Sequence, residues 1–175
     1  MKVAYADPPY PGQSAKHYAE HPDYKGEVDH EELLDQLQLH YDGWALSTSS
    51  VALRDVLTMS PPDVRVMAWV KPFAAYKRNV TVAYTWEPVL VKPVRPATPN
   101  RIEGVVCRDH IAESITMKRG LTGAKPERFC WWLFEVLGLH PHDDLVDLFP
   151  GSGAVARAHT SWKQALRQTS MEVAA

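Results

Sequence analysis

The stretch that decides the fold is DLVDLFPGSGAVARA, residues 144–158. Its first part, 144–149, has the apolar character of a buried strand, and residues 154–158 begin a helix. Between them lies the turn Pro150-Gly151-Ser152-Gly153, where glycine lets a bulky ligand approach the backbone because it has no Cβ. The stretch therefore predicts a nucleotide-binding corner, although such a turn can also be a plain strand-to-helix connection. The turn lacks the lysine of G-x-x-x-x-G-K-S/T and the spacing of G-x-G-x-x-G, which argues against a triphosphate or an ordinary dinucleotide.

A second motif, Asp7-Pro8-Pro9-Tyr10, follows the short apolar run of residues 3–6 at a predicted strand end. The exocyclic amine of adenine or cytosine is a poor nucleophile because its lone pair is delocalised into the ring, so an enzyme must hold its hydrogens. The Asp7 carboxylate and the Pro8 carbonyl can accept them. Tyr10 offers a flat face for a flipped base, a contact worth roughly 1–3 kcal/mol. Alone, the tetrapeptide could also be an ordinary turn.

In this order the two motifs resemble those of the permuted N6-adenine methyltransferases that use S-adenosylmethionine, in which D-P-P-Y precedes F-x-G-S-G. The beta class of DNA amino-methyltransferases shares this order, as do relatives of the messenger-RNA adenosine methyltransferases, which usually carry Trp at the place of Tyr10. Lys125-Pro126, before the helical stretch 127–137, also resembles these families. The resemblance implies a three-layer, Rossmann-like α/β methyltransferase fold, with a mostly parallel sheet and helices on both faces.

The resemblance also implies a site and a cofactor, S-adenosylmethionine. The expected catalytic residues are Asp7, Pro8, Pro9 and Tyr10, and the expected cofactor-binding residues are Asp7, Lys125, Asp147, Phe149, Gly151, Ser152 and Gly153. Lys125 would reach toward the methionine portion of the cofactor. No metal is expected, because the sulfonium already activates the methyl group, and transfer needs alignment and acceptors for the amine hydrogens.

The chain has 175 residues, which suits one domain spanning 1–175, and a formal net charge of −2. That charge argues against a generic, charge-driven nucleic-acid binder, so nucleic-acid contacts must be local. The expected substrate-binding residues are Tyr10, His17, Tyr18, Lys71, Lys77 and Arg78, and the expected substrate-facing loops are 11–28 and 92–124. DNA is favoured over RNA as the partner, with a homodimer or a second subunit left open. The absence of a signal peptide and of an apolar run near ~18 residues, together with only two cysteines, predicts a cytoplasmic protein with free thiols.

The rest of the chain alternates predicted strands and helices. We expect helices at 29–41, 49–57 and 127–137, strands at 2–6, 43–48 and 64–70, a strand or hairpin within 80–91, and a short helix near 111–117. Glu87, an acid before a proline, is interpreted as a turn residue in preference to a substrate contact. Residues 140–144, HPHDD, are interpreted as a polar turn, because a metal site needs convergent ligands.

The segment after the glycine turn departs from the family pattern. The beta-class enzymes continue with a strand that brings an acid to the cofactor ribose, whereas residues 154–175 contain no apolar strand ending in Asp or Glu. Arg157, His159, Ser161 and Gln164 are candidates for that contact, and none is assigned. The expected function is methylation of the exocyclic amine of adenine in DNA. Two alternatives stay open: amino-methylation of RNA adenine or DNA cytosine, and a catalytically silent, nucleic-acid-binding subunit.

Overall fold

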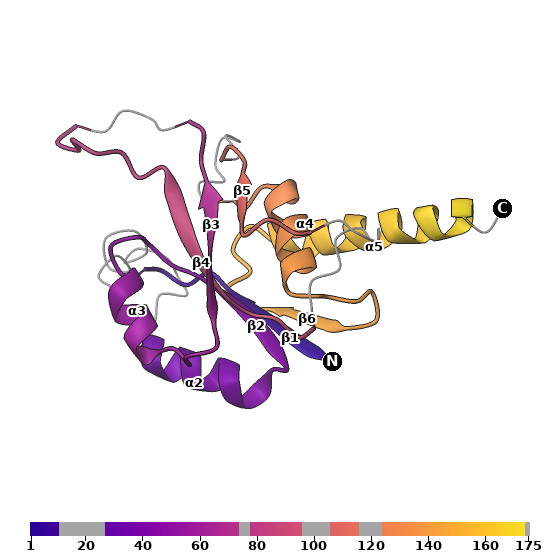
Figure 1. Ribbon diagram of the computed structural model, residues 1–175, viewed down its shortest axis with the longest axis horizontal. Helices are drawn as coiled ribbons and strands as arrows, with labels where there is room; N and C mark the ends of the chain where they lie inside the picture. Colours follow the sequence, from indigo (N-terminus) through magenta and orange to yellow (C-terminus); the bar gives the residue numbers. More distant parts are fainter. Residues whose placement is uncertain (11–26, 74–77, 96–105, 116–123, 174–175) are drawn as a thin grey trace.

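The computed structural model describes residues 1–10, 27–73, 78–95, 106–115 and 124–173, with side chains up to residue 168. Within these ranges, strands form a six-stranded sheet flanked by helices (Figure 1). The strands are β1 (Lys2–Ala6), β2 (Gly43–Ser47), β3 (Arg65–Val70), β4 (Trp86–Lys92), β5 (His110–Ala112) and β6 (Asp144–Asp147). The helices are α2 (His30–His40), α3 (Leu53–Met59), α4 (Glu127–Val136) and α5 (Ala154–Val173). None of these helices is both long and apolar enough to cross a membrane.

The sheet has the strand order β5-β3-β4-β2-β1-β6. β1 pairs in parallel with β2, where Ala4 lies opposite Trp44, and with β6, where Tyr5 lies opposite Asp147. β4 is antiparallel to both of its neighbours, β2 and β3, and β5 runs parallel to β3. A mostly parallel sheet is covered on both faces, which agrees with the nearly continuous burial of β1 and β2.

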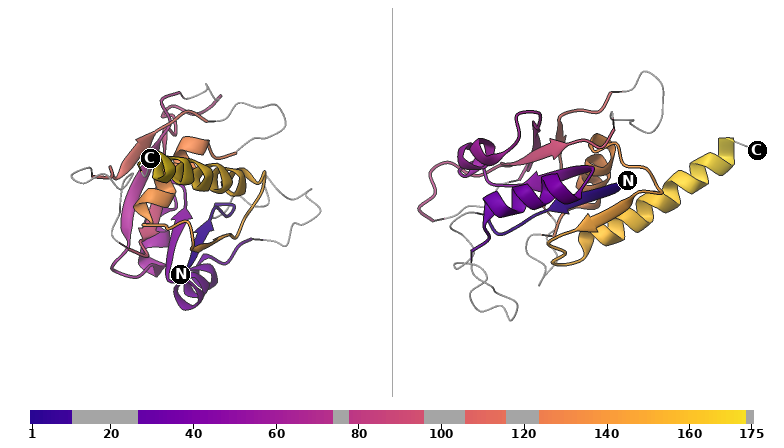
Figure 2. Two further views of the ribbon diagram at one scale, coloured as in Figure 1. Left: turned by 90° about the vertical axis from the view of Figure 1, so that its right-hand side faces the viewer. Right: turned by 90° about the horizontal axis from the view of Figure 1, so that it is seen from below.

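Helices cover both faces of the sheet (Figures 1 and 2). Successive strand residues point to opposite faces, so Val3 and Tyr5 of β1 join one core cluster and Ala4 and Ala6 join the other. α4 and α5 supply Phe129, Leu133 and Trp162 to the first core cluster, and α2 and α3 supply Leu34, Leu37 and Val56 to the second. The predicted three-layer, mostly parallel fold is confirmed.

Local hydrogen bonds before α2 and α3 set where these helices begin. Oδ1 of Asp29 accepts hydrogen bonds from two backbone N–H groups in the first turn of α2, each at 3.0 Å, so this helix begins where the sequence predicts. The predicted helix 49–57 begins later. Oγ of Ser49 accepts a hydrogen bond from the N of Ala52 at 3.1 Å and holds a turn, so α3 starts only at Leu53.

The prediction of a short helix near 111–117 is wrong over its described residues, 111–115, because residues 111 and 112 belong to β5 and the next three residues are not helical. The N of Ala68 donates to the carbonyl of Asp109 at 3.0 Å, and the N of Glu113 donates to the carbonyl of Val70 at 2.9 Å. Pairing with β3 therefore overrides the local preference for a helix. The range 92–124, expected to be a substrate-facing loop, thus contains a strand.

Candidate active site

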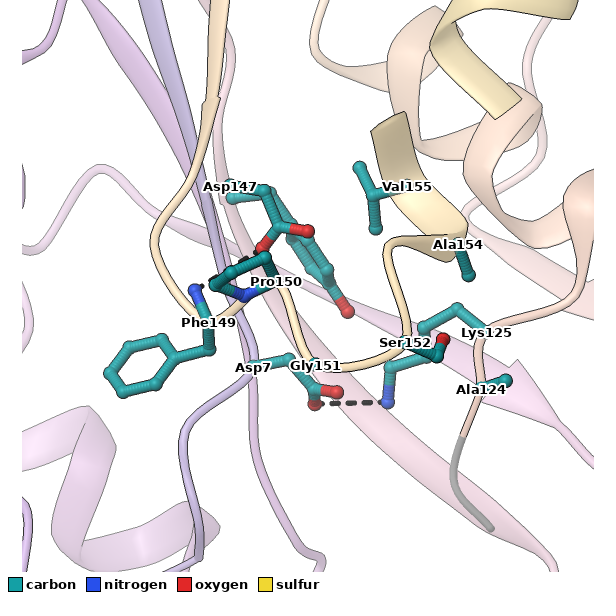
Figure 3. Close-up of a pocket in the computed structure, with 11 residues that line it drawn as sticks. Asp7, Ala124, Lys125, Asp147, Phe149, Pro150, Gly151, Ser152, Ala154 and Val155 are labelled. Carbon is teal, nitrogen blue, oxygen red and sulfur yellow. Dashed lines mark hydrogen bonds and ion pairs between the residues drawn. The ribbon is translucent and has the colours of Figure 1, made fainter. Parts of the chain in front are cut away.

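Segments far apart in the sequence meet at the carboxyl ends of β1 and β6 (Figure 3). Because β1 and β6 are parallel neighbours, Asp7 and the glycine turn lie at the same edge of the sheet, and Lys125 reaches this edge from the segment before α4. They line a shallow hollow whose empty space, open solvent included, is about 300 Å³. The lining residues are Tyr5, Asp7, Ala124, Lys125, Asp147, Phe149, Pro150, Gly151, Ser152, Ala154 and Val155.

The hollow lies where the connections of two adjacent strands diverge. The next described helix after β1 is α2, which packs on one face of the sheet, whereas α5 follows β6 and packs on the other. In open α/β sheets, this divergence leaves a crevice outside the carboxyl ends of the strands, and ligands bind there. The topology therefore makes this hollow the leading candidate for a binding site.

The glycine turn has a backbone that other residues rarely adopt. Gly151 has φ +43° and Gly153 has φ +71°, both in the left-handed region. A Cβ on Gly151 would lie 3.8 Å from the carbonyl oxygen of Phe149, which is ordinary contact, and one on Gly153 would lie 3.3 Å from a nitrogen of Arg157. Arg157 also braces the turn by donating to the carbonyl of Ser152 at 2.8 Å. Backbone conformation, more than crowding within the protein, thus favours glycine here.

A network of four alternating charges lies beside the hollow. Nζ of Lys125 is 2.9 Å from Oδ1 of Asp7 and 3.2 Å from Oε2 of Glu87. The other oxygen of Glu87, Oε1, accepts a hydrogen bond from Lys71. The Lys125 side chain is only 7% exposed, and those of Glu87 and Lys71 are also largely buried. The charges must compensate one another, because a buried charge without a partner costs several kcal/mol.

Aromatic rings support the two ammonium groups of this network. Nζ of Lys125 lies 5.1 Å from the ring centre of Trp69 and 5.8 Å from that of Phe129, and Nζ of Lys71 lies 4.8 Å from the Trp69 ring. Trp69 is itself held in place, since its Nε1 donates to the carbonyl of Glu113 at 2.7 Å. The rings therefore position both lysines as well as packing the core.

Burial and neighbouring charges shift the pKa values around the hollow. Burial raises the pKa of Asp7. Lys125 acts to lower this pKa, and the negative charge of Glu87 acts to raise it. Burial also raises the pKa of Asp147, which Asp7 raises further. Burial acts to raise the pKa of Glu87 too, but its lysine partners outweigh it and the pKa is lowered. Lys125 remains protonated, because its two carboxylate partners raise its pKa despite burial. A cationic ligand would offset the charges of Asp7 and Asp147.

The structure brings most of the predicted cofactor-binding residues to the hollow, namely Asp7, Lys125, Asp147, Phe149, Gly151 and Ser152. Gly153 belongs to the same turn but is not among the lining residues. The ring of Phe149 points away from Lys125 (Figure 3) and packs against the second core cluster. Of the other predicted catalytic residues, Pro8 is buried, and Pro9 and Tyr10 are half-buried.

The predicted substrate-binding residues are more scattered. Lys71 is paired with Glu87 and largely buried, so it is poorly placed to contact a phosphate. Arg78 is exposed on the connection between β3 and β4. His17, Tyr18 and Lys77 lie outside the residues that the structure describes.

Two residues at or beside this hollow were not among those predicted from the sequence. Tyr5 lines the hollow, and its hydroxyl lies 2.8 Å from Oγ of Ser47. The alternation of strand residues could have found it, because Tyr5 precedes Asp7 by two positions. The interpretation of Glu87 as a turn residue is wrong: it lies in β4 and bonds two lysines. Only the pairing of β3 with β4, which sets Glu87 opposite Trp69, reveals this role.

The polar turn before β6 contains a buried ion pair. The carboxylate of Asp143 accepts hydrogen bonds from Arg95 at 2.5 and 2.9 Å and from the N of His140 at 2.8 Å. Arg95 holds the pKa of Asp143 well below its usual range. Among the residues that the structure describes, no group of three or more His, Cys, Asp or Glu side chains could hold a metal ion. Asp143 thus ties the segment after β4 to β6.

Comparison with known proteins finds similarity in structure. No protein-family model matches the sequence, and no curated protein matches it. PvuII DNA methyltransferase (cytosine-N4-specific) is 13% identical, with a TM-score of 0.62 over 92% of this chain and 71% of that chain. M1.HpyAVI is 15% identical, with a TM-score of 0.60 over 93% of this chain and 77% of that chain; in its complex with SAM the values are 15%, 0.56, 93% and 78%. The chain therefore has the Rossmann-like methyltransferase fold.

Proposed function

We propose that this protein is a methyltransferase that uses S-adenosylmethionine (SAM) and acts on the exocyclic amine of adenine in DNA. One observation carries the proposal: Asp7 of the D-P-P-Y motif, Lys125 and the glycine turn converge on a single hollow. Each is suited to a different part of the reaction, namely holding an amine, binding a carboxylate and admitting a ligand close to the backbone. The fold supports the same conclusion, since it is shared with DNA methyltransferases.

The groups around the hollow fit SAM, which has a sulfonium, an ammonium and a carboxylate. Asp7 and Asp147 provide negative charge for its positive centres. The ammonium of Lys125 has three hydrogens, of which the described residues account for two, so one remains for a ligand carboxylate. The space at the Cβ position of Gly151 leaves the backbone of the turn accessible to a ligand.

The target amine would be held by Asp7 and the carbonyl of Pro8, which accept its two hydrogens and direct the nitrogen lone pair toward the methyl carbon. When bound, SAM supplies a methyl group whose S–C bond breaks as the new N–C bond forms, and the amine then loses one proton to water. Tyr10, directly after the two prolines, provides the face on which the base stacks. Lys125 keeps Asp7 in place during this step through its 2.9 Å ion pair.

Adenine as the target base and DNA as the target polymer are the most specific elements of the proposed function. The same acceptors would hold the amine of cytosine, and RNA adenine presents the same group, so these remain the alternative substrates. Nucleoside analysis of digested product identifies the methylated base directly.

The proposal also includes a cytoplasmic location, which is supported by Cys107 and Cys130, since neither forms a disulfide.

Calorimetric titration with SAM and S-adenosylhomocysteine is the first test. Gly151→Trp would fill the hollow, and Gly151→Asn is its matched control, because Asn tolerates left-handed backbone and adds little bulk. We expect saturable binding by the wild type and the Asn variant and no binding by the Trp variant. A wild-type protein that binds neither compound would contradict the proposal and favour a silent subunit.

A further inference from the structure

The connection between β3 and β4 exposes an unusual set of aromatic rings. We define the β3–β4 arm as residues 71–73 and 78–86, the described part of this connection with the first residue of β4. Phe73 is 55% exposed, Tyr84 59% and Trp86 38%. Figure 1 shows the arm running beyond the end of the sheet before the chain returns into β4. Several large rings exposed on one short segment indicate a contact surface.

The charge of this segment favours a polyanion as the partner. Residues 71–86 contain no Asp or Glu and include Lys77 and Arg78 in addition to Lys71, whose charge Glu87 balances, in a chain whose net charge is −2. Arg78 is exposed on the arm. Aromatic rings combined with cations form the surface by which proteins bind unpaired nucleic acid, with bases stacked on the rings and phosphates near the cations.

The arm is joined directly to the candidate active site. The backbone N of Lys71 donates to the carbonyl of Thr85 at 2.6 Å, which closes the arm at its base. The side chain of Lys71 bonds Glu87, which lies 3.2 Å from Lys125, the partner of Asp7. A strand whose target base reaches Asp7 would therefore have neighbouring bases within the region of the arm.

We infer that the β3–β4 arm binds the strand that carries the target base by stacking on unpaired bases next to it. The substrate class is then single-stranded or locally opened nucleic acid, because bases inside a duplex already stack on one another and offer no free face. This inference rests on the proposed function and names its substrate class. A protein partner would also use exposed rings, but it would not need a segment that is basic and free of acids.

The test compares binding of one labelled oligonucleotide, as a single strand and as a duplex, by fluorescence anisotropy at one fixed salt concentration. The variants are Phe73→Ala and Tyr84→Ala, and Val82→Ala is the matched control, since Val82 is a 78% exposed aliphatic side chain on the same arm. We expect the wild type to prefer the single strand. Each ring variant should weaken that binding about 5- to 150-fold, whereas the control should not change it.

Two outcomes would overturn the inference. In the first, the ring variants bind the single strand like the wild type, or the wild type binds the duplex as well as the single strand. In the second, the wild type sediments as a dimer that Val82→Ala and Tyr84→Ala both dissociate, which would make the arm a contact between copies of this chain. Thermal unfolding of each variant checks that the fold is intact.

An assay of methyl transfer distinguishes a failure of this inference from a failure of the proposed function. If the single strand binds through the rings but no methyl group is transferred to it, the proposed function is contradicted and the inference about the arm is supported. If methylation occurs on duplex DNA and the ring variants keep the wild-type rate, the inference about the arm is contradicted and the proposed function is supported.

Discussion

Nζ of Lys125 lies 2.9 Å from Oδ1 of Asp7, so the buried lysine is paired with the carboxylate that we propose holds the target amine. The second partner of Lys125 is Glu87, at 3.2 Å. The two acids share one ammonium, and each therefore influences the charge and the position of the other. The consequences can be measured separately as rate, stability and pH dependence.

Asp7→Asn should remove most of the methyl transfer while leaving the fold largely intact and weakening the binding of SAM much less than the rate, since Asp147 keeps its negative charge beside the hollow. The amide keeps the shape of the side chain but loses the negative charge that holds the amine hydrogens, whereas the Pro8 carbonyl remains. Loss of one such preorganised group lowers rates by about 100- to 1,000-fold. Transfer of radiolabelled methyl groups measures the rate, and calorimetry with SAM is the control. A variant with the wild-type rate would remove Asp7 from the mechanism.

Lys125→Met should destabilise the protein strongly. It removes a buried positive charge and leaves the carboxylates of Asp7 and Glu87 without it, a change that costs about 3–5 kcal/mol for buried pairs. Urea denaturation at neutral pH measures the free energy of unfolding. Arg128→Met is the control, because Arg128 is exposed and its Nε lies 3.5 Å from Glu113, so its loss should cost below about 1 kcal/mol. Equal, small losses in both variants would mean that Lys125 is solvated in solution.

Glu87→Gln should move the acidic limb of the pH–rate profile to lower pH. Burial raises the pKa of Asp7, Lys125 opposes this, and the negative charge of Glu87 adds to the increase. Removing that charge lowers the pKa of Asp7, which then stays ionised, and able to accept the amine hydrogens, at more acidic pH. The rate of methyl transfer across the acidic range measures the shift.

Glu113→Gln is the matched control for this profile, because Glu113 pairs with Arg128 outside the network. A profile for Glu87→Gln that overlays the wild-type profile would show that Asp7 does not control the acidic limb. A lower rate with an unshifted profile would indicate that Glu87 only supports the fold.

The parts of the fold that could be predicted are those with local signals. The glycine turn after β6, the D-P-P-Y sequence after β1 and the cap at Asp29 can each be recognised within a few residues. The first two place the hollow correctly at one edge of the sheet, and the third marks the start of α2. The pairing of β4 between β2 and β3 is not local. For this reason the role of Glu87, which depends on that pairing, could not be predicted, nor could β5, which exists only through its contacts with β3.

His159 should make the protein less stable as the pH falls. It packs against Phe134, with ring centres 5.5 Å apart, and against Trp162, at 6.0 Å, and the described residues offer its Nε2 no hydrogen-bond partner. Burial, helped by Lys163, lowers its pKa to about 4. The unfolded chain has a pKa of about 6.5 at this residue, so between these values the unfolded state binds more protons and stability decreases with decreasing pH.

His159→Phe should therefore flatten the pH dependence of unfolding. The imidazole accounts for on the order of 1 kcal/mol of lost stability between neutral pH and about pH 5, because solvent screens the half-buried ring, and Phe retains the packing without a titrating group. Urea denaturation at the two pH values measures the difference for the wild type, for His159→Phe and for the control His142→Gln, whose side chain is exposed. If the Phe variant and the wild type lose the same free energy, the imidazole of His159 becomes charged within the folded protein, and the ring contacts around it must open to water.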